Sequence, residues 1–215
     1  MLIAVNKAHF PVTVLGPGRR LGIWLQGCSI RCRGCVSQDT WERDAGRLMP
    51  VEALLAWCRG VAAAGLEGVT ISGGEPFDQP QALECLLRGL TDWRTQSGRE
   101  FDLLCYSGWP LGELERRHSR LLALLDALIP EPFIDAQPTE RAWRGSGNQP
   151  VMPLSPLGHD RYGAADACAH AARLQVRVDG ERIWYIGIPR RGDMDLLEKR
   201  CAERGLEFKC VSWRA

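Results

Sequence analysis

The sequence lacks any long apolar run. No stretch approaches the roughly 20 apolar residues that a membrane-spanning helix needs, and residues 1–10 lack the apolar segment of a signal peptide. The net charge is also small, at +1 for 215 residues. Because nucleic acids and anionic membranes attract strongly basic proteins, neither is expected as the main partner. Internal repeats and low-complexity segments are absent as well. These absences predict a globular protein of the cytoplasm.

Cysteine, by contrast, is plentiful. The chain has nine cysteines, an odd number. Disulfide frameworks are rare in cytosolic proteins and typical of much shorter secreted chains. Metal binding fits better, provided that some of the cysteines are clustered.

Apolar runs and helical periodicities alternate through residues 21–135. The strands are expected at 2–6, 21–26, 68–72, 101–106 and within 127–134, and the helices at 50–64, 80–93 and 111–128. This alternation predicts an α/β fold, with a parallel sheet covered by helices. Ligands of such sheets sit beyond the carboxyl ends of the strands. Residues 27–35, 72–76 and 106–109 each follow a strand, which predicts one site at one rim.

The character of the chain changes after residue 150. A Pro- and Gly-rich loop is followed by a hairpin signal, two β-branched and aromatic runs around Asp179-Gly180. The remaining elements are expected to be a helix over 193–204 and a last strand over 208–213. We therefore divide the chain into a main unit, residues 1–155, and a small α+β appendage, residues 156–215.

Cys28, Cys32 and Cys35 have the spacing C-x3-C-x2-C. Three thiolates so close along one loop can converge on one metal centre. Structural zinc sites normally take four ligands, and the next cysteine, Cys58, falls inside an expected helix. A cubane iron–sulfur cluster held by three cysteines leaves one iron open for another ligand. A zinc knuckle completed by a distant ligand, or three unrelated buried cysteines, remain as alternatives.

The other cysteines lie on expected helices and strands, where they are interpreted as core residues. A second cluster from Cys168, Cys201 and Cys210 is an alternative, although their spacing gives no close pair of ligands.

The cysteine motif, together with Gly73-Gly74-Glu75-Pro76 after the next strand, resembles the signature of the radical S-adenosylmethionine (SAM) superfamily. The resemblance implies a partial (βα) barrel and one [4Fe–4S] cluster on the three cysteines. It also implies that the amino and carboxylate groups of SAM bind the open iron. Gly73 and Gly74 would let the backbone approach SAM closely, and Glu75 would accept bonds from its ammonium group.

A narrower resemblance covers roughly residues 10–155. Further segments are similar to the activating enzymes of anaerobic ribonucleotide reductase and to related short single-cluster proteins: 16–19, 26–28, 40–41, 106–109 and 144–149. By this resemblance Gly34 and Val36 lie along the adenine of SAM, and Ser107, Arg144 and Asn148 contact its ribose or carboxylate. The chain departs from the family at Val36, where an aromatic residue is common, and at Pro130-Glu131, where Asp-Gly is common.

The expected activity is reductive cleavage of SAM to a 5′-deoxyadenosyl radical, which then abstracts hydrogen from a backbone glycine of a large partner enzyme. A flavodoxin or ferredoxin is the expected electron donor. Two alternatives stay open at this point: a radical SAM enzyme acting on a small molecule, peptide or nucleotide-like compound, and a non-catalytic iron–sulfur module.

Overall fold

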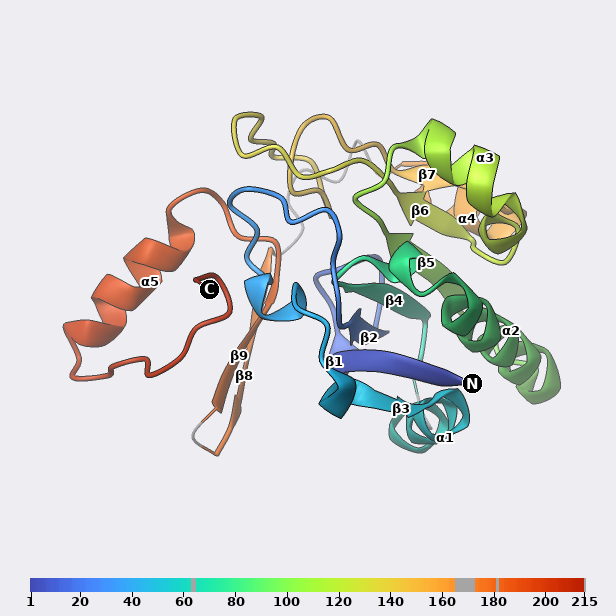
Figure 1. Ribbon diagram of the computed structural model, residues 1–215, viewed down its shortest axis with the longest axis horizontal. Helices are drawn as coiled ribbons and strands as arrows, with labels where there is room; N and C mark the ends of the chain where they lie inside the picture. Colours follow the sequence, from blue (N-terminus) through green and yellow to red (C-terminus); the bar gives the residue numbers. More distant parts are fainter. Residues whose placement is uncertain (63–64, 165–172, 181, 215) are drawn as a thin grey trace.

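The computed structural model describes residues 1–62, 65–164, 173–180 and 182–214. A seven-stranded sheet in the order β3-β1-β2-β4-β5-β6-β7 forms its centre (Figure 1). The four central strands are parallel: β2 (Arg20–Leu25), β4 (Gly68–Gly73), β5 (Asp102–Tyr106) and β6 (Ala127–Ile129). The flanking strands are antiparallel: β1 (Leu2–Val12), β3 (Leu48–Pro50) and β7 (Met152–Pro153). The α/β class is confirmed, and β3 and β7 end an open sheet, consistent with a partial barrel.

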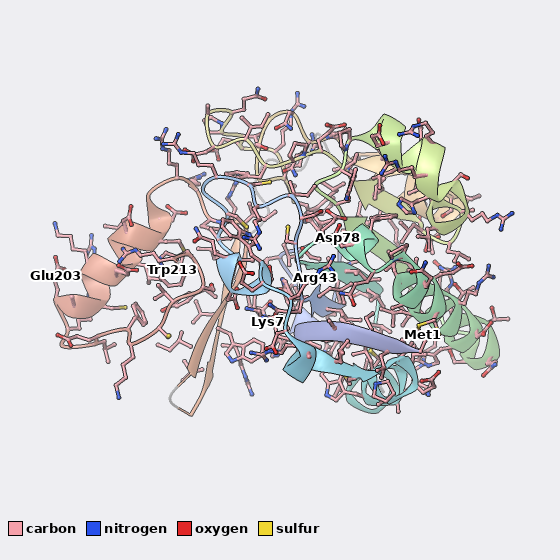
Figure 2. The ribbon with its side chains drawn as sticks, viewed as in Figure 1. Met1, Lys7, Arg43, Asp78, Glu203 and Trp213 are labelled. Carbon is pink, nitrogen blue, oxygen red and sulfur yellow. The ribbon has the colours of Figure 1, made fainter. Side chains whose placement is uncertain are left out.

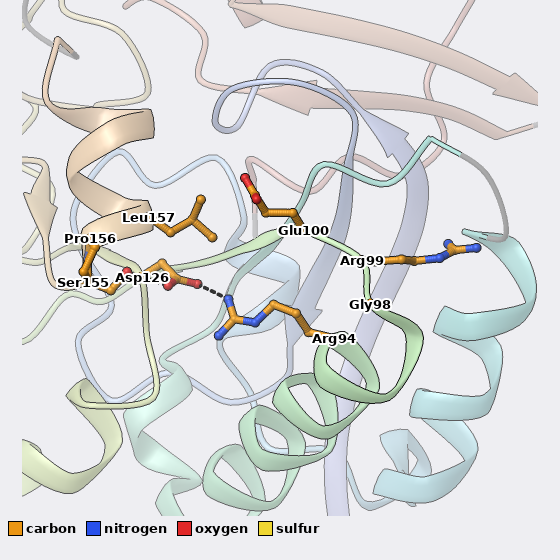
Figure 3. Close-up of a pocket in the computed structure, with 8 residues that line it drawn as sticks. All are labelled: Arg94, Gly98, Arg99, Glu100, Asp126, Ser155, Pro156 and Leu157. Carbon is orange, nitrogen blue, oxygen red and sulfur yellow. Dashed lines mark hydrogen bonds and ion pairs between the residues drawn. The ribbon is translucent and has the colours of Figure 1, made fainter.

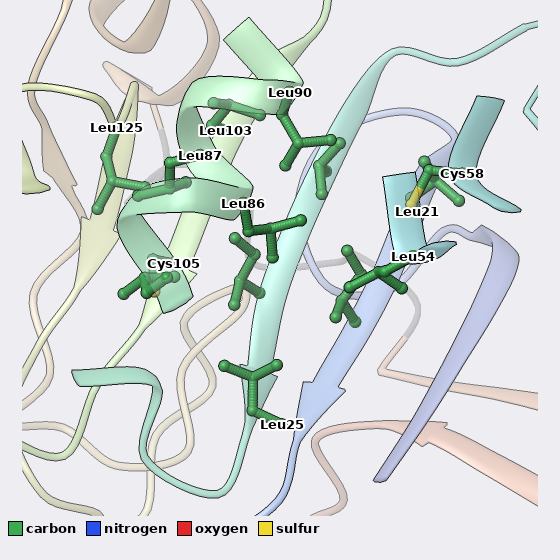
Figure 4. Close-up of a cluster of buried hydrophobic side chains, with 14 of the residues drawn as sticks. Leu21, Leu25, Leu54, Cys58, Leu86, Leu87, Leu90, Leu103, Cys105 and Leu125 are labelled. Atoms are coloured by element: carbon green, nitrogen blue, oxygen red, sulfur yellow. The ribbon is translucent and has the colours of Figure 1, made fainter. Parts of the chain in front are cut away.

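One face of the sheet carries the main core and the helices α1 (Val51–Val61), α2 (Pro80–Ser97) and α3 (Leu111–Leu122). Helix α2 begins at a proline, which suits a first turn, and ends before Gly98 in the left-handed conformation, at φ 62°. Its leucines at helical spacing are fully buried against the strands (Figure 4). Each such side chain contributes about 1.5–3 kcal/mol to folding.

The opposite face is covered by helix α4 (Pro156–Tyr162) and by the hairpin of β8 (Leu174–Asp179) and β9 (Arg182–Gly187). Trp24 of β2 packs here against Ile186 of β9, and Tyr162 packs against strands β5 and β6. The hairpin was predicted, and the division at residue 155 stays a prediction. Helix α5 (Asp193–Ala202) follows the hairpin (Figure 1).

A buried ion pair closes the amino end of the parallel strands. Arg20 and Asp102 are fully buried and joined by two hydrogen bonds of 2.9 and 2.6 Å. The hydroxyl of Tyr162 donates to the same carboxylate at 2.6 Å, and Arg161 approaches it at 2.9 Å. Burial raises the pKa of Asp102, but the charge and hydrogen bonds of Arg20, helped by Tyr162 and Arg161, bring this pKa below its ordinary value.

Two predicted elements differ from the structure. Helix α3 ends at Leu122, because Leu124 and Leu125 bond back only three residues, as in turns. Residues 208–213 do not form the predicted strand, since the carbonyl of Ser212 bonds to a distant loop rather than to a strand edge. Cys168, a member of the alternative second cluster, lies outside the described residues. Within the described chain, every helix is too short or too polar to cross a bilayer.

Candidate functional site

The cysteine loop begins where β2 ends. The N–H of Gly27 donates to the carbonyl of Thr40 at 2.7 Å, and the N–H of Cys28 donates to that of Trp41 at 2.9 Å. These bonds close the base of a loop that carries all three clustered cysteines. We call this segment, residues 27–41, the cysteine loop. Gly27 has φ 96°, a conformation that glycine adopts without strain. The buried strand thus delivers Cys28 directly to the carboxyl edge of the sheet.

The loop touches the segments that follow the three other parallel strands. Beyond β4, Asp78 accepts hydrogen bonds from the N–H of Ser29 at 2.7 Å and from its hydroxyl at 2.8 Å. Beyond β5, a Cβ added to Gly108 would lie 2.9 Å from Ile30. Beyond β6, Phe133 lies next to Gly34. The predicted meeting of these segments at one rim is therefore observed.

Gly73 and Gly74 press directly against the base of the cysteine loop. The N–H of Gly74 donates to the carbonyl of Leu25 and that of Glu75 to the carbonyl of Gly27, both at 2.8 Å. Gly73 has φ 102°. A Cβ on Gly74 would overlap the carbonyl oxygen of Gly27. Glycine is needed here for the close approach of two backbones.

We expect Gly74→Ala to destabilise the protein by about 1–3 kcal/mol, because the added methyl group must push the Gly27 carbonyl away. Urea unfolding measures this loss. Gly112→Ala in α3 is the matched control, since a Cβ there meets nothing within 4 Å and alanine favours a helix. Equal stability of Gly74→Ala and wild type would contradict the packing described here.

Glu75 joins two of the loops through its buried carboxylate. One oxygen accepts bonds from the Ser107 hydroxyl at 2.9 Å and the Phe77 N–H at 3.0 Å, and the other accepts from the Gly108 N–H at 2.7 Å. Burial nevertheless raises the pKa of Glu75 to about 7, although these three donors lower it. The hydroxyl of Ser107, a predicted SAM contact, is itself bonded to Glu75 and to the N–H of Trp109.

The raised pKa of Glu75 predicts a pH dependence of stability in the cluster-free protein. The folded chain binds this proton more tightly than the unfolded chain, so its contribution is present below about pH 4.5 and is lost as pH rises to about 7. Relative to Glu75→Gln, which cannot titrate, wild type should lose roughly 3 kcal/mol of unfolding free energy over this interval. Urea unfolding of both proteins at several pH values measures the difference. A constant difference would contradict the raised pKa.

The three clustered thiols are half-buried and form no disulfide. Burial raises the pKa of each, while backbone N–H groups of Arg31, Phe133 and Ser37 lower those of Cys28, Cys32 and Cys35 respectively. Among the residues that the structure describes, no group of three or more His, Cys, Asp or Glu side chains is arranged as a finished metal site. The loop nevertheless brings the three thiols into one neighbourhood, since Cys28 and Cys32 each interact electrostatically with Cys35.

The donor set nevertheless fits an iron–sulfur cluster. Three thiolates are the soft ligands that such clusters take. The indole N–H of Trp41 is buried and, among the described residues, finds no other partner; it points toward the thiol of Cys35, and this hydrogen-bond donor lowers the pKa of that thiol. A buried N–H donor beside the sulfur is of the kind that tunes bound clusters. Sequence reasoning noted Trp41 only as part of a motif.

The segment 144–149 is bound to the chain that follows β6. The amide of Gln149 donates to the carbonyl of Glu131 at 2.9 Å, and the amide of Asn148 donates to that of Pro132 at 2.9 Å. The side-chain oxygen of Asn148 is buried and finds no hydrogen-bond donor among the residues that the structure describes, so it can accept a bond from a ligand. Arg144 is also buried. These residues therefore lie beyond the carboxyl end of β6, against the segment that follows this strand.

Two residues that organise the site were not predicted from the sequence. Asp78 fixes the start of the cysteine loop, and Phe133 turns its N–H toward Cys32. Asp78 lies just past the Gly-Gly-Glu-Pro segment, and that position is the one signal by which it could have been found.

An open pocket lies at the other end of the sheet (Figure 3). It is lined by residues from the end of α2 and the start of α4, including the ion pair of Arg94 with Asp126 at 2.7 Å. Asp126 directly precedes β6, so this pocket is at the amino edge. It is therefore separate from the site built by the cysteine loop.

Comparisons with known proteins show which family the chain resembles. The profile of the 4Fe-4S single cluster domain family matches residues 14–152. A relative in Vibrio cholerae is 30% identical over 148 residues, which are 66% of this chain and 94% of the relative. A relative in phage T4 is 28% identical over 136 residues, 63% of this chain and 85% of the relative. Both are named anaerobic ribonucleoside-triphosphate reductase-activating protein. Among solved structures, QueE from Escherichia coli aligns with 50% of this chain and 53% of its own, at 25% identity and a TM-score of 0.38.

Proposed function

Because the chain belongs to the family of 4Fe-4S single cluster domains, we propose that it is a radical SAM activating enzyme that generates a glycyl radical on a partner enzyme. The observation that carries this proposal is the packing of the cysteine loop against Gly73, Gly74 and Glu75 at one rim of a parallel sheet. The reductase-activating relatives support the same activity.

Cys28, Cys32 and Cys35 would hold one [4Fe–4S] cluster. When bound, the cluster supplies the electron that cleaves SAM to methionine and a 5′-deoxyadenosyl radical. The loop itself positions the three thiolates, and Trp41 keeps a buried N–H beside Cys35.

The remaining rim residues would bind and orient SAM. Gly73 and Gly74 would place backbone groups close to the methionyl end, and Glu75 would offer a carboxylate whose proton occupancy changes near pH 7. Gly34 and Val36 would lie along the adenine. The buried side-chain oxygen of Asn148 is available to accept a hydrogen bond from SAM.

Ser107 and Arg144 complete the proposed SAM site. Ser107 acts through Glu75, because its hydroxyl already donates to that carboxylate. Arg144 is buried and supplies a positive charge close to Tyr106, which suits the carboxylate of SAM.

The proposed partner is an enzyme of the anaerobic ribonucleotide reductase class, since that is what the names of the relatives specify. A flavodoxin or ferredoxin in the cytoplasm would supply the electron. A small-molecule, peptide or nucleotide-like substrate is the alternative outcome of the test below.

The test is anaerobic reconstitution with iron and sulfide, followed by dithionite and SAM, with 5′-deoxyadenosine quantified. Addition of the candidate reductase should then give a glycyl radical signal by electron paramagnetic resonance. Cleavage of SAM without that signal would move the substrate to the alternative class. A four-iron cluster without SAM cleavage would overturn the proposed activity.

A further inference from the structure

The C-terminal tail, residues 203–214, follows α5 and contacts the cysteine loop. Residues 153–215 lie beyond the segment that the family profile matches, and within them Ser212 and Trp213 lie against the cysteine loop. Figure 1 shows the C-terminus between α5 and the short helical turn Gln38–Thr40, and Figure 2 shows Trp213 on the same side of α5.

Four hydrogen bonds join the tail to the loop around Gln38, and a fifth lies within the loop itself. The carbonyl of Ser212 accepts the N–H of Gln38 at 2.7 Å and that of Asp39 at 3.4 Å, and the hydroxyl of Ser212 donates to the carbonyl of Val36 at 3.0 Å. The side-chain amide of Gln38 donates to the carbonyl of Trp213 at 3.0 Å and to that of Cys35 at 3.1 Å. The amide of Gln38 thus links the tail directly to a predicted cluster ligand.

The tail is itself anchored to the appendage. The indole of Trp213 meets the rings of Tyr185 and Phe208 edge-on, with centroids 6.3 and 6.2 Å apart. Its N–H donates to Glu198 of α5 at 2.8 Å. Aromatic contacts of this kind add about 0.5–1.5 kcal/mol beyond the area they bury. The hydrogen bonds to the loop are therefore made by a segment held in place from behind.

We propose that Ser212 and Trp213 are positioning residues that brace the Cys35–Asp39 half of the cysteine loop. The inference rests on the proposed function, because it assigns the brace to the loop that holds the cluster. This half of the loop has little regular structure, and fixing it costs conformational entropy. The tail offsets that cost and keeps Cys35 in place, while Cys28 is fixed independently by its bond to Trp41.

Two truncations test the brace. A chain ending at Val211 loses Ser212 and Trp213, while a chain ending at Trp213 is the matched control and keeps every contact to the loop. In the cluster-free protein, iodoacetamide should alkylate Cys35 several-fold faster in the chain ending at Val211, with the rate at Cys28 unchanged. After reconstitution, a chelator should remove iron from this chain several-fold faster. The control should match the full chain in both measurements.

The outcomes separate the brace from the proposed function. Unchanged alkylation of Cys35 and unchanged iron release would overturn the brace. Faster alkylation of Cys35 in a protein that takes up no cluster would support the brace and overturn the proposed function. If the chain ending at Val211 does not fold, Gln38→Leu decides, because it removes the side-chain bonds of Gln38 to Cys35 and to Trp213. Faster alkylation of Cys35 supports the brace, and an unchanged rate overturns it.

Discussion

A Cys32→Ala variant is expected to form no stable four-iron cluster and to release no 5′-deoxyadenosine from SAM. The chain provides three clustered thiols, and loss of one leaves two ligands for a cluster that needs three. Cys32 is also the thiol toward which the Phe133 N–H is directed, so this change removes a sulfur that the fold has placed. Iron and sulfide content, the visible absorption of the cluster and the yield of 5′-deoxyadenosine measure the effect.

Cys85→Ala is the matched control. Cys85 is a half-buried free cysteine of α2, packed at the edge of the main core, and it should be replaceable without loss of the cluster. If Cys32→Ala kept four irons and the full yield of 5′-deoxyadenosine, the three-cysteine site would be wrong. If Cys85→Ala lost the cluster as well, the main core rather than the ligand set would be responsible.

The position of the site was predictable because its parts follow buried strands. Leu21–Gln26 and Gly68–Ser72 are apolar or β-branched runs that end directly before the cysteines and before Gly73. Since the carboxyl ends of parallel strands meet at one edge, the order of these segments was enough to bring them together. The spacing of Cys28, Cys32 and Cys35 then indicated the kind of metal site.

The contact of the tail with the cysteine loop was not predictable in this way. Phe208, Val211 and Trp213 suggest a strand by composition, but the two aromatic rings pack edge-on against Tyr185 and pair with no described strand. A run of apolar residues predicts that their side chains will pack against other parts of the protein, but it does not identify which parts. Most hydrogen bonds of Ser212 are made by its backbone carbonyl. Every residue has this group, so the sequence cannot indicate which carbonyl will form such bonds.

Glu131 illustrates a departure from the family that the structure explains. Its φ is 80°, in the left-handed region that favours glycine, and glycine is common there in the family that the sequence resembles. The carboxylate of Glu131 accepts the N–H of Leu111 at 3.0 Å, which satisfies a free donor at the start of α3. The side chain thus gains a capping bond at the position where the backbone is strained.

Asp102→Ala is expected to lower the free energy of unfolding by about 3–5 kcal/mol. The substitution leaves the guanidinium of Arg20 fully buried without its main counter-charge, and it also removes the acceptor of the Tyr162 hydroxyl. Burying an uncompensated charge is costly because the protein interior solvates it poorly. Urea unfolding measures the loss. Glu113→Ala, which breaks exposed ion pairs with Arg116 and Arg117, is the control and should cost far less, because exposed ion pairs contribute little to stability.

The partner of Asp102 lies 82 residues earlier in the chain, so no local pattern could reveal the pair. If the cost of Asp102→Ala comes from the unpaired guanidinium, then replacing both charges, as in Arg20→Met with Asp102→Leu, should recover part of the lost stability. A double variant no more stable than Asp102→Ala would place the cost instead in the lost bond of Tyr162, and so in the packing of α4 on the sheet. A loss below 1 kcal/mol in the single variant would mean that water reaches Arg20, and the amino end of the sheet would not be sealed by this pair.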